Sequence, residues 1–155
     1  MFNTSKEKNN IPLFIAGILS LIAVLLHLAC IVGGENWFRF LGAGEEMAMM
    51  ATQGSWVPTV VTLFVAGVLA TWACYAFSGA SVLPRMPLLK PTLFAISTIF
   101  ILRGLLLIPL WLGWLNSTEQ SGDFWFWSSI ICLIYGLFYA IGTYQVWKNL
   151  GNKHV

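Results

Sequence analysis

The chain has 155 residues, of which 58% are hydrophobic and only 9% are charged, and its formal net charge is +2. Soluble domains carry roughly 25% charged residues, so this composition excludes an ordinary water-soluble globule, and no basic patch of the kind that binds nucleic acid is present. The chain is predicted to be an integral membrane protein and a single all-α domain over residues 1–155, because no hydrophilic stretch is long enough for a second domain.

Four apolar runs each reach the length of about 20 residues that a helix needs to cross a bilayer. We place spanning helices near residues 11–32, 56–77, 92–114 and 124–147. Asn10 is the expected N-cap of the first helix, since asparagine side chains accept hydrogen bonds from first-turn amides. The first run is too long for the core of a signal peptide, so we expect it to be retained. The predicted fold is an antiparallel bundle of four transmembrane helices.

The connection between the first two spans, residues 33–55, is long and oily for a loop and reads GGENWFRFLGAGEEMAMMATQGS. Residues 45–53 are predicted to form a short helix, because Glu45 and Glu46 would lie at its N-terminus, where the helix dipole favours negative charge. We expect this segment to cap the outer end of the bundle. The connection 78–90 contains Gly79, Pro84 and Pro87 and is predicted to be non-helical. The connection 116–122 is short and polar and is predicted to join the third and fourth helices as an antiparallel hairpin.

The charges alternate between the connections and predict a topology. Acidic residues dominate the first and third connections, whereas basic residues occupy both tails and the second connection, namely Lys6, Lys8, Arg85, Lys90, Lys148 and Lys153. Loops rich in Lys and Arg stay in the cytoplasm. Both termini are therefore predicted to be cytoplasmic.

Arg103 is the most informative residue, because it falls in the middle of the third predicted span. An arginine at mid-depth costs about 2.5 kcal/mol on insertion scales, so it usually has a partner and a purpose. None of the predicted spans contains an acidic residue, and we therefore expect Glu45 or Glu46 to reach in from the first connection. The other polar candidates at a similar depth are His27, Tyr135 and Tyr139.

This cluster has three interpretations. It can be a structural lock between the first connection and the bundle, or a site that binds a small polar or anionic ligand. In the third interpretation Arg103 extends alone toward the interface from a tilted helix.

Catalytic and metal-binding motifs are not found. The cysteines Cys30, Cys74 and Cys132 lie one each in three spans and form no C-x-x-C pair, so thiol redox chemistry is not predicted. The spacings that hold zinc are missing, as are phosphate-binding glycine loops and nucleophile elbows. We predict no catalytic residue, no metal and no cofactor.

Between Leu41 and Pro109 the chain contains the strings LGAGEEMAMMATQGS, YAFSGASVLPRMPLL and LRGLLLIP. This stretch resembles a group of small four-helix inner-membrane proteins of Gram-negative bacteria that have no assigned function. The resemblance implies a location in the bacterial inner membrane and a four-span topology, and it implies nothing about activity.

The preferred functional hypothesis is a small-molecule binding or transport protein. Binding or transport is favoured over catalysis because the sequence contains no recognisable nucleophile–base pair and no recognisable metal site. The alternatives are an accessory subunit that assembles with itself or with a larger membrane complex, and a membrane-embedded enzyme. The predicted partners are the lipid bilayer, a small polar or anionic ligand, and a homo-oligomer or membrane complex, with no role for nucleic acid.

Overall fold

The structure is a computed structural model that describes residues 10–106 and 119–151, with side chains for 126–148 in the second range. All regular structure in these ranges is helical, which confirms the predicted all-α class. The helices are α1 (Ile11–Gly33), α2 (Glu35–Phe40), α3 (Glu45–Thr52), α4 (Val57–Gly79), α5 (Leu89–Leu105) and α7 (Glu119–Gly151).

Three helical segments are long and apolar enough to cross a membrane, judged by length and composition: Ile11–Gly33, Val57–Gly79 and Phe126–Lys148. They correspond to the first, second and fourth predicted spans. Helix α5 has 17 residues and ends at Leu105. Residues 107–114 of the third predicted span lie outside the described residues.

Two predicted boundaries need correction. Helix α7 begins at Glu119, before the start predicted at 124. A glutamate is favoured in the first turn of a helix by the helix dipole. The connection between α4 and α5 is also slightly shorter than predicted, because α4 continues to Gly79 and α5 begins at Leu89.

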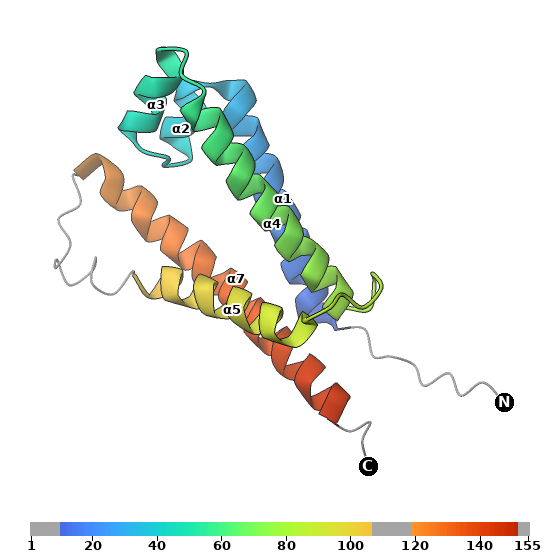
Figure 1. Ribbon diagram of the computed structural model, residues 1–155. Helices are drawn as coiled ribbons and strands as arrows, with labels where there is room; N and C mark the ends of the chain where they lie inside the picture. The colour runs from blue at the N-terminus through green and yellow to red at the C-terminus, as the bar shows by residue number, and fades with distance from the viewer. Residues whose placement is uncertain (1–9, 107–118, 152–155) are drawn as a thin grey trace.

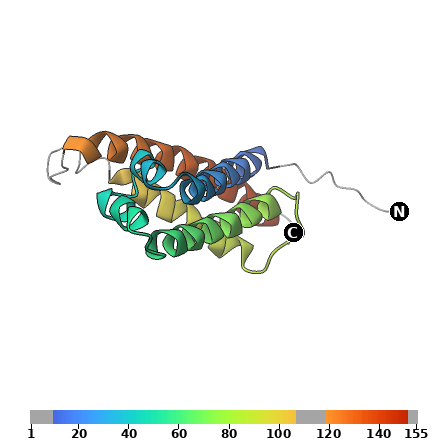
Figure 2. The same cartoon turned by 90° about the horizontal axis from the view of Figure 1, so that it is seen from above.

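The long helices form two pairs. Helix α1 packs along α4, and α5 packs along α7 (Figure 1). Helices α2 and α3 connect α1 to α4 and lie at one end of the molecule, whereas the start of α1 and the end of α7 lie at the other (Figures 1 and 2).

The two pairs are joined most closely around Leu13 of α1, which is fully buried. A Cβ atom built on Gly79 of α4 would lie 2.5 Å from the Leu13 side chain, and one on Gly142 of α7 would lie 2.4 Å from it. Asn10 strengthens the same junction, because its side-chain amide donates to the Gly142 carbonyl at 2.7 Å. Its side-chain oxygen accepts from the Leu13 amide at 3.1 Å, which confirms Asn10 as the N-cap of α1.

The contact between the pairs does not extend along their full length. The buried residues of α1 are Leu13, Ala16, Gly17 and Ser20, after which the next is Cys30 near the far end. The pairs diverge toward the end that carries α2 and α3 (Figure 1). The main hydrophobic core therefore occupies the half of the bundle near Leu13.

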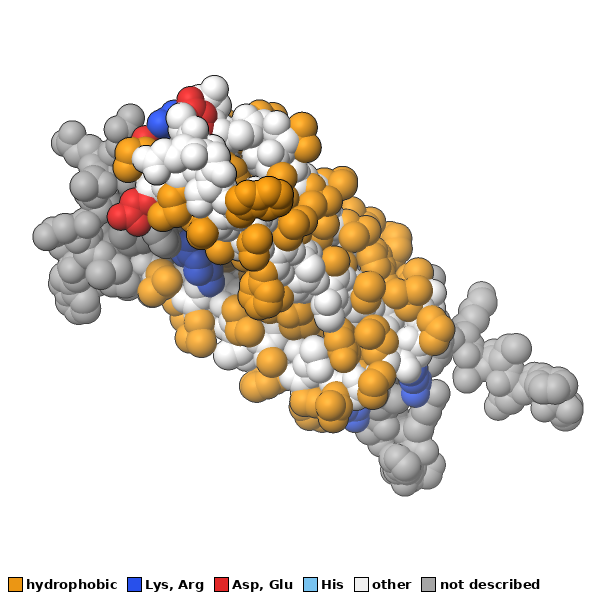
Figure 3. Space-filling view, turned by 45° about the horizontal axis from the view of Figure 1, so that its top comes forward, with side chains coloured by type: hydrophobic (Ala, Val, Ile, Leu, Met, Phe, Trp, Pro, Cys, Tyr) orange, Lys and Arg blue, Asp and Glu red, His pale blue; other side chains and the backbone are white. Residues whose placement is uncertain are grey.

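Acidic side chains gather over α2 and α3, basic side chains appear both beside them and at the opposite end, and apolar side chains cover much of the face between (Figure 3). The exposed apolar residues include Leu25 and Phe64, which are 65% and 72% exposed. This exposed apolar surface suits contact with lipid, because large apolar surfaces that face water are rare in soluble proteins.

Candidate functional site

Residues 34–55, which include helices α2 and α3, form a small folded unit that we call the cap. Its own core consists of Phe38 of α2 and Ala48 of α3, which are buried with Cys30 at the end of α1. Partly buried Leu41 and Ala51 pack against this core. The cap is therefore attached to α1 by apolar contacts.

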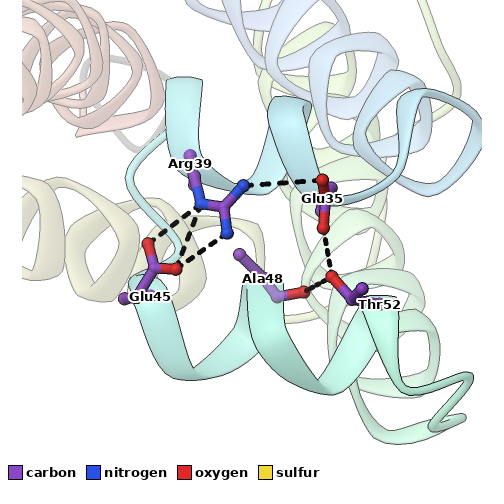
Figure 4. Close-up of polar contacts among 5 residues, drawn as sticks. All are labelled: Glu35, Arg39, Glu45, Ala48 and Thr52. Carbon is purple, nitrogen blue, oxygen red and sulfur yellow. Dashed lines mark hydrogen bonds and ion pairs between the residues drawn. The ribbon is translucent and has the colours of Figure 1, made fainter.

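Arg39 is the centre of the polar contacts in the cap (Figure 4). Its Nε donates to Oε2 of Glu45 at 2.9 Å, and its Nη2 donates to Oε1 of the same carboxylate at 2.8 Å. Its Nη1 lies 3.6 Å from Glu35 one turn earlier. Thr52 completes the chain, since its hydroxyl bonds the Ala48 carbonyl at 3.0 Å and also contacts the Glu35 carboxylate.

The pairing changes the ionisation of both groups. The hydrogen bond from Arg39 lowers the pKa of Glu45, and the same bond raises the pKa of Arg39. Both groups are solvent-exposed, so the charge pair is screened by water and ions. The forked geometry fixes the relative orientation of α2 and α3 more than it adds to global stability.

Glycines at the helix boundaries make the cap possible. Gly34 has φ +67° and ψ −150°, and Gly44 has φ +96° and ψ 155°. This region of backbone conformation is essentially restricted to glycine. A Cβ on Gly33 would lie 1.9 Å from the Trp37 ring, so a side chain there is excluded by the tryptophan.

An aromatic layer marks the point at which the main core ends. The ring of Phe100 of α5 lies 5.2 Å from that of Trp72 of α4, 5.2 Å from Tyr135 and 5.6 Å from Tyr139, both of α7. Offset and edge-to-face packing of this kind is favourable beyond the apolar area that it buries.

The two tyrosine hydroxyls join helices through backbone carbonyls. Tyr135 donates to the Leu19 carbonyl of α1 at 2.6 Å. Tyr139 donates to the Trp72 carbonyl of α4 at 3.1 Å, and its oxygen lies 2.8 Å from the hydroxyl of Ser20 of α1. Because the Tyr139 proton points to Trp72, Ser20 supplies the proton of the second bond.

Arg103 lies directly beyond this layer. It follows Phe100 by one helical turn of α5, so both side chains occupy one face of that helix. Its Nη2 donates to the hydroxyl of Ser128 of α7 at 3.4 Å. Its charge also acts on the thiol of Cys132, one turn further along α7. A guanidinium and a serine hydroxyl are thus placed together where α5 meets α7.

His27 of α1 is half-buried, and its Nδ1 lies 2.7 Å from the Ala23 carbonyl of its own helix. A carbonyl oxygen only accepts, so Nδ1 carries the proton. Nε2 is then the basic nitrogen of the neutral ring.

The structure distributes the predicted site residues over three places. Tyr135 and Tyr139 lie in the aromatic layer, and Arg103 lies next to it. Glu45 binds Arg39 in the cap, and Glu46 is exposed on α3. His27 is bonded within its own helix.

Sequence reasoning overlooked Arg39 and Ser128. An ion pair of Arg39 could have been predicted, because Arg39 is spaced i, i+4 from Glu35 and is the only Lys or Arg in the segment 33–55. Ser128 precedes Tyr135 by two turns, so its position on the same helix face was also readable. The sequence did not show which residue of α5 it meets.

The described residues contain no group of three or more His, Cys, Asp or Glu side chains that could hold a metal ion. Comparison with known proteins adds no assignment: no family model, no curated protein and no solved structure matches the chain.

Proposed function

We propose that this protein is a four-span membrane bundle that binds, and carries across the bilayer, a small anionic molecule at Arg103 and Ser128. The observation that carries the proposal is the hydrogen bond between these two side chains, located where the pairs α1–α4 and α5–α7 diverge. The resemblance of the segment from Leu41 to Pro109 supports the bacterial inner membrane as its location.

The chemistry of the pair fits an anion. A guanidinium presents five N–H donors in a planar fork that matches a carboxylate or a phosphate. Ser128 accepts from Arg103, and its hydroxyl, like any serine hydroxyl, can both donate and accept, so a ligand would compete with Cys132 for its proton. The side chains of Glu35 and Glu45 bind Arg39 in the cap.

His27 is included in this proposal as a proton-accepting group. The buried residues Leu13, Ala16 and Ser20 trace the face of α1 that meets α7, and continuing this pattern at helical spacing reaches His27. Its Nε2 is suited to accept a proton or a hydrogen bond from a ligand. A ligand that carries both an anionic group and a hydrogen-bond donor satisfies both residues.

The proposed topology has both termini in the cytoplasm and the cap outside. A cysteine introduced at exposed Gln53, directly after α3, in a chain without native cysteines, tests it. A membrane-impermeant maleimide is expected to label this cysteine in intact spheroplasts, whereas a cysteine at Ser5 requires lysis. The reverse pattern of labelling would overturn the topology.

An accessory or assembly subunit is the second candidate. It is favoured by how many of the predicted ligand residues already form hydrogen bonds within the chain. Tyr135 and Tyr139 bond other helices, Glu45 bonds Arg39, and His27 bonds its own helix. In this case Arg103 and Ser128 act only to hold α5 against α7.

Native mass spectrometry from lipid nanodiscs separates the two candidates. The wild type and Arg103→Lys are expected to retain a non-lipid anionic mass that Arg103→Met loses, because the lysine keeps the charge. Arg39→Met is the matched control, since it removes an arginine from the cap only. A wild type without ligand, together with loss of an oligomer in Arg103→Met, would support the accessory subunit instead.

A further inference from the structure

Lys90 and Trp147 form a cation–π pair at the end of the bundle opposite the cap. The ammonium nitrogen of Lys90, in the first turn of α5, lies 5.6 Å from the centroid of the Trp147 ring near the end of α7. The face of an indole ring attracts a cation at this distance through its quadrupole. It holds a positive charge and an indole ring together across two helices.

Other positive charges gather at this end. Lys148 follows Trp147 directly and is exposed, and exposed Arg85 lies in the connection that leads to α5. The carboxylate side chains that the structure describes, Glu35, Glu45 and Glu46, all belong to the cap at the far end (Figure 3). Two lysines and a tryptophan are thus brought together at the end of the molecule opposite the cap.

The pair also lies at the depth expected for lipid headgroups. The candidate spans Val57–Gly79 and Phe126–Lys148 both end here, and Ile11–Gly33 begins here. The contacts of Leu13 with Gly79 and Gly142 hold these helix ends at one level. Tryptophan rings prefer this boundary between hydrocarbon and water, and lysines beside it attract anionic lipids.

We propose that Lys90, Trp147 and Lys148 form a binding site for the headgroup of an anionic phospholipid. The two ammonium groups bind the phosphate oxygens, and the Trp147 ring packs against the glycerol and the first part of the acyl chains. The occupant is a lipid rather than a soluble anion, because Trp147 is 49% exposed at the end of an apolar candidate span, where indole rings pack against lipid. This site is separate from Arg103.

The test measures lipid retention by native mass spectrometry. The detergent-solubilised protein is mixed with equal amounts of phosphatidylglycerol and phosphatidylcholine, and the ratio of bound lipids is compared among variants. Each basic residue near a membrane surface contributes about fivefold in affinity for anionic lipid, so Lys90→Gln and Lys148→Gln together are expected to reduce the preference about 25-fold. Lys90→Arg is expected to retain it, because arginine keeps both the charge and the stacking on tryptophan.

Controls distinguish the lipid site from other causes. Arg39→Gln removes a charge at the cap and Arg103→Met removes the one at the proposed ligand site, and both are expected to keep the lipid preference. Thermal unfolding in phosphatidylcholine verifies that each variant is folded. The proposal is overturned if the wild type shows no preference, if the double variant keeps it, or if inorganic phosphate competes as well as the lipid does.

Discussion

Tyr139 of α7 and Ser20 of α1 share a hydrogen bond of 2.8 Å, although 119 positions separate them in the chain. The Tyr139 hydroxyl also donates to the Trp72 carbonyl of α4. One fully buried side chain therefore ties the pair α5–α7 to both helices of the pair α1–α4.

Replacing Tyr139 with phenylalanine tests the strength of this connection. The variant loses two interhelical hydrogen bonds and keeps the ring, so its free energy of unfolding is expected to fall by about 1–2 kcal/mol. Denaturation in mixed micelles measures the change. Tyr144→Phe is the matched control, because Tyr144 is 69% exposed. Equal effects in the two variants would contradict a role for the Tyr139 hydroxyl.

Gly104→Ala is expected to separate α5 from α7. A Cβ at this position would lie 2.4 Å from Cγ of Leu133 and 2.9 Å from its backbone nitrogen, which cannot move without shifting α7. Overpacking of this kind costs about 1–3 kcal/mol, measurable by thermal unfolding in detergent.

Gly67 of α4 provides the control for Gly104, because a Cβ there would meet nothing within 4 Å. Gly67→Ala is expected to be neutral or to stabilise by up to about 1 kcal/mol, since alanine favours helix more than glycine does. Destabilisation by Gly67→Ala matching that of Gly104→Ala would show that the close contact with Leu133 is unimportant.

The cap is expected to loosen in acid. The hydrogen bond from Arg39 holds the pKa of Glu45 below its ordinary value of 4.5. A depressed pKa means that the contribution of Glu45 to cap stability is complete above the ordinary value and is lost as the pH falls through the lower, folded value. Titration of the Glu45 carboxyl carbon by NMR measures this pKa directly.

Arg39→Gln supplies the comparison for that titration. It removes the donor, so the midpoint for Glu45 is expected to move up toward 4.5. An unchanged midpoint in Arg39→Gln would mean that another group sets the ionisation of Glu45.

Gly44→Ala isolates the effect of backbone conformation in the cap. A Cβ on Gly44 would meet nothing within 4 Å, so any loss of stability comes from its φ of +96°. Strain of this kind costs about 1–3 kcal/mol, and the amides of α3 are expected to exchange faster in hydrogen-exchange mass spectrometry. Unchanged exchange would indicate that the backbone can adopt another turn at no cost.

Hydrophobic run length was enough to predict α1, α4 and the apolar part of α7, because spanning segments must satisfy their backbone groups internally as helices. The N-cap residue of α1 could also be predicted, because the side chain of Asn10 accepts a hydrogen bond from the amide of Leu13, only three positions along the chain. The helix from Glu45 to Thr52 matches the segment predicted at 45–53. Its position outside the membrane stays a prediction.

The partners of the charged residues could not be predicted from the sequence in this way. Arg39 meets Glu45 only because the backbone turns at Gly42 and Gly44, both of which have positive φ. Arg103 meets Ser128 because the packing of Leu133 on Gly104 and of Ile101 on Gly136 fixes how α5 and α7 are rotated about their axes. Helices that are apolar on every side do not encode that rotation in their hydrophobic pattern.

The bond from Asn10 to the Gly142 carbonyl also has a consequence for the order of assembly. It joins residues 132 positions apart, so the start of the first span finds this partner only after most of the chain has been synthesised. Leu13 is in the same situation, because its contact with Gly142 also depends on the last helix. Membrane helices insert individually and associate afterwards. The two helix pairs therefore join late in folding, through contacts between residues far apart in the sequence. A chain interrupted before Gly142 can form the pair α1–α4 but not the junction that unites the two pairs.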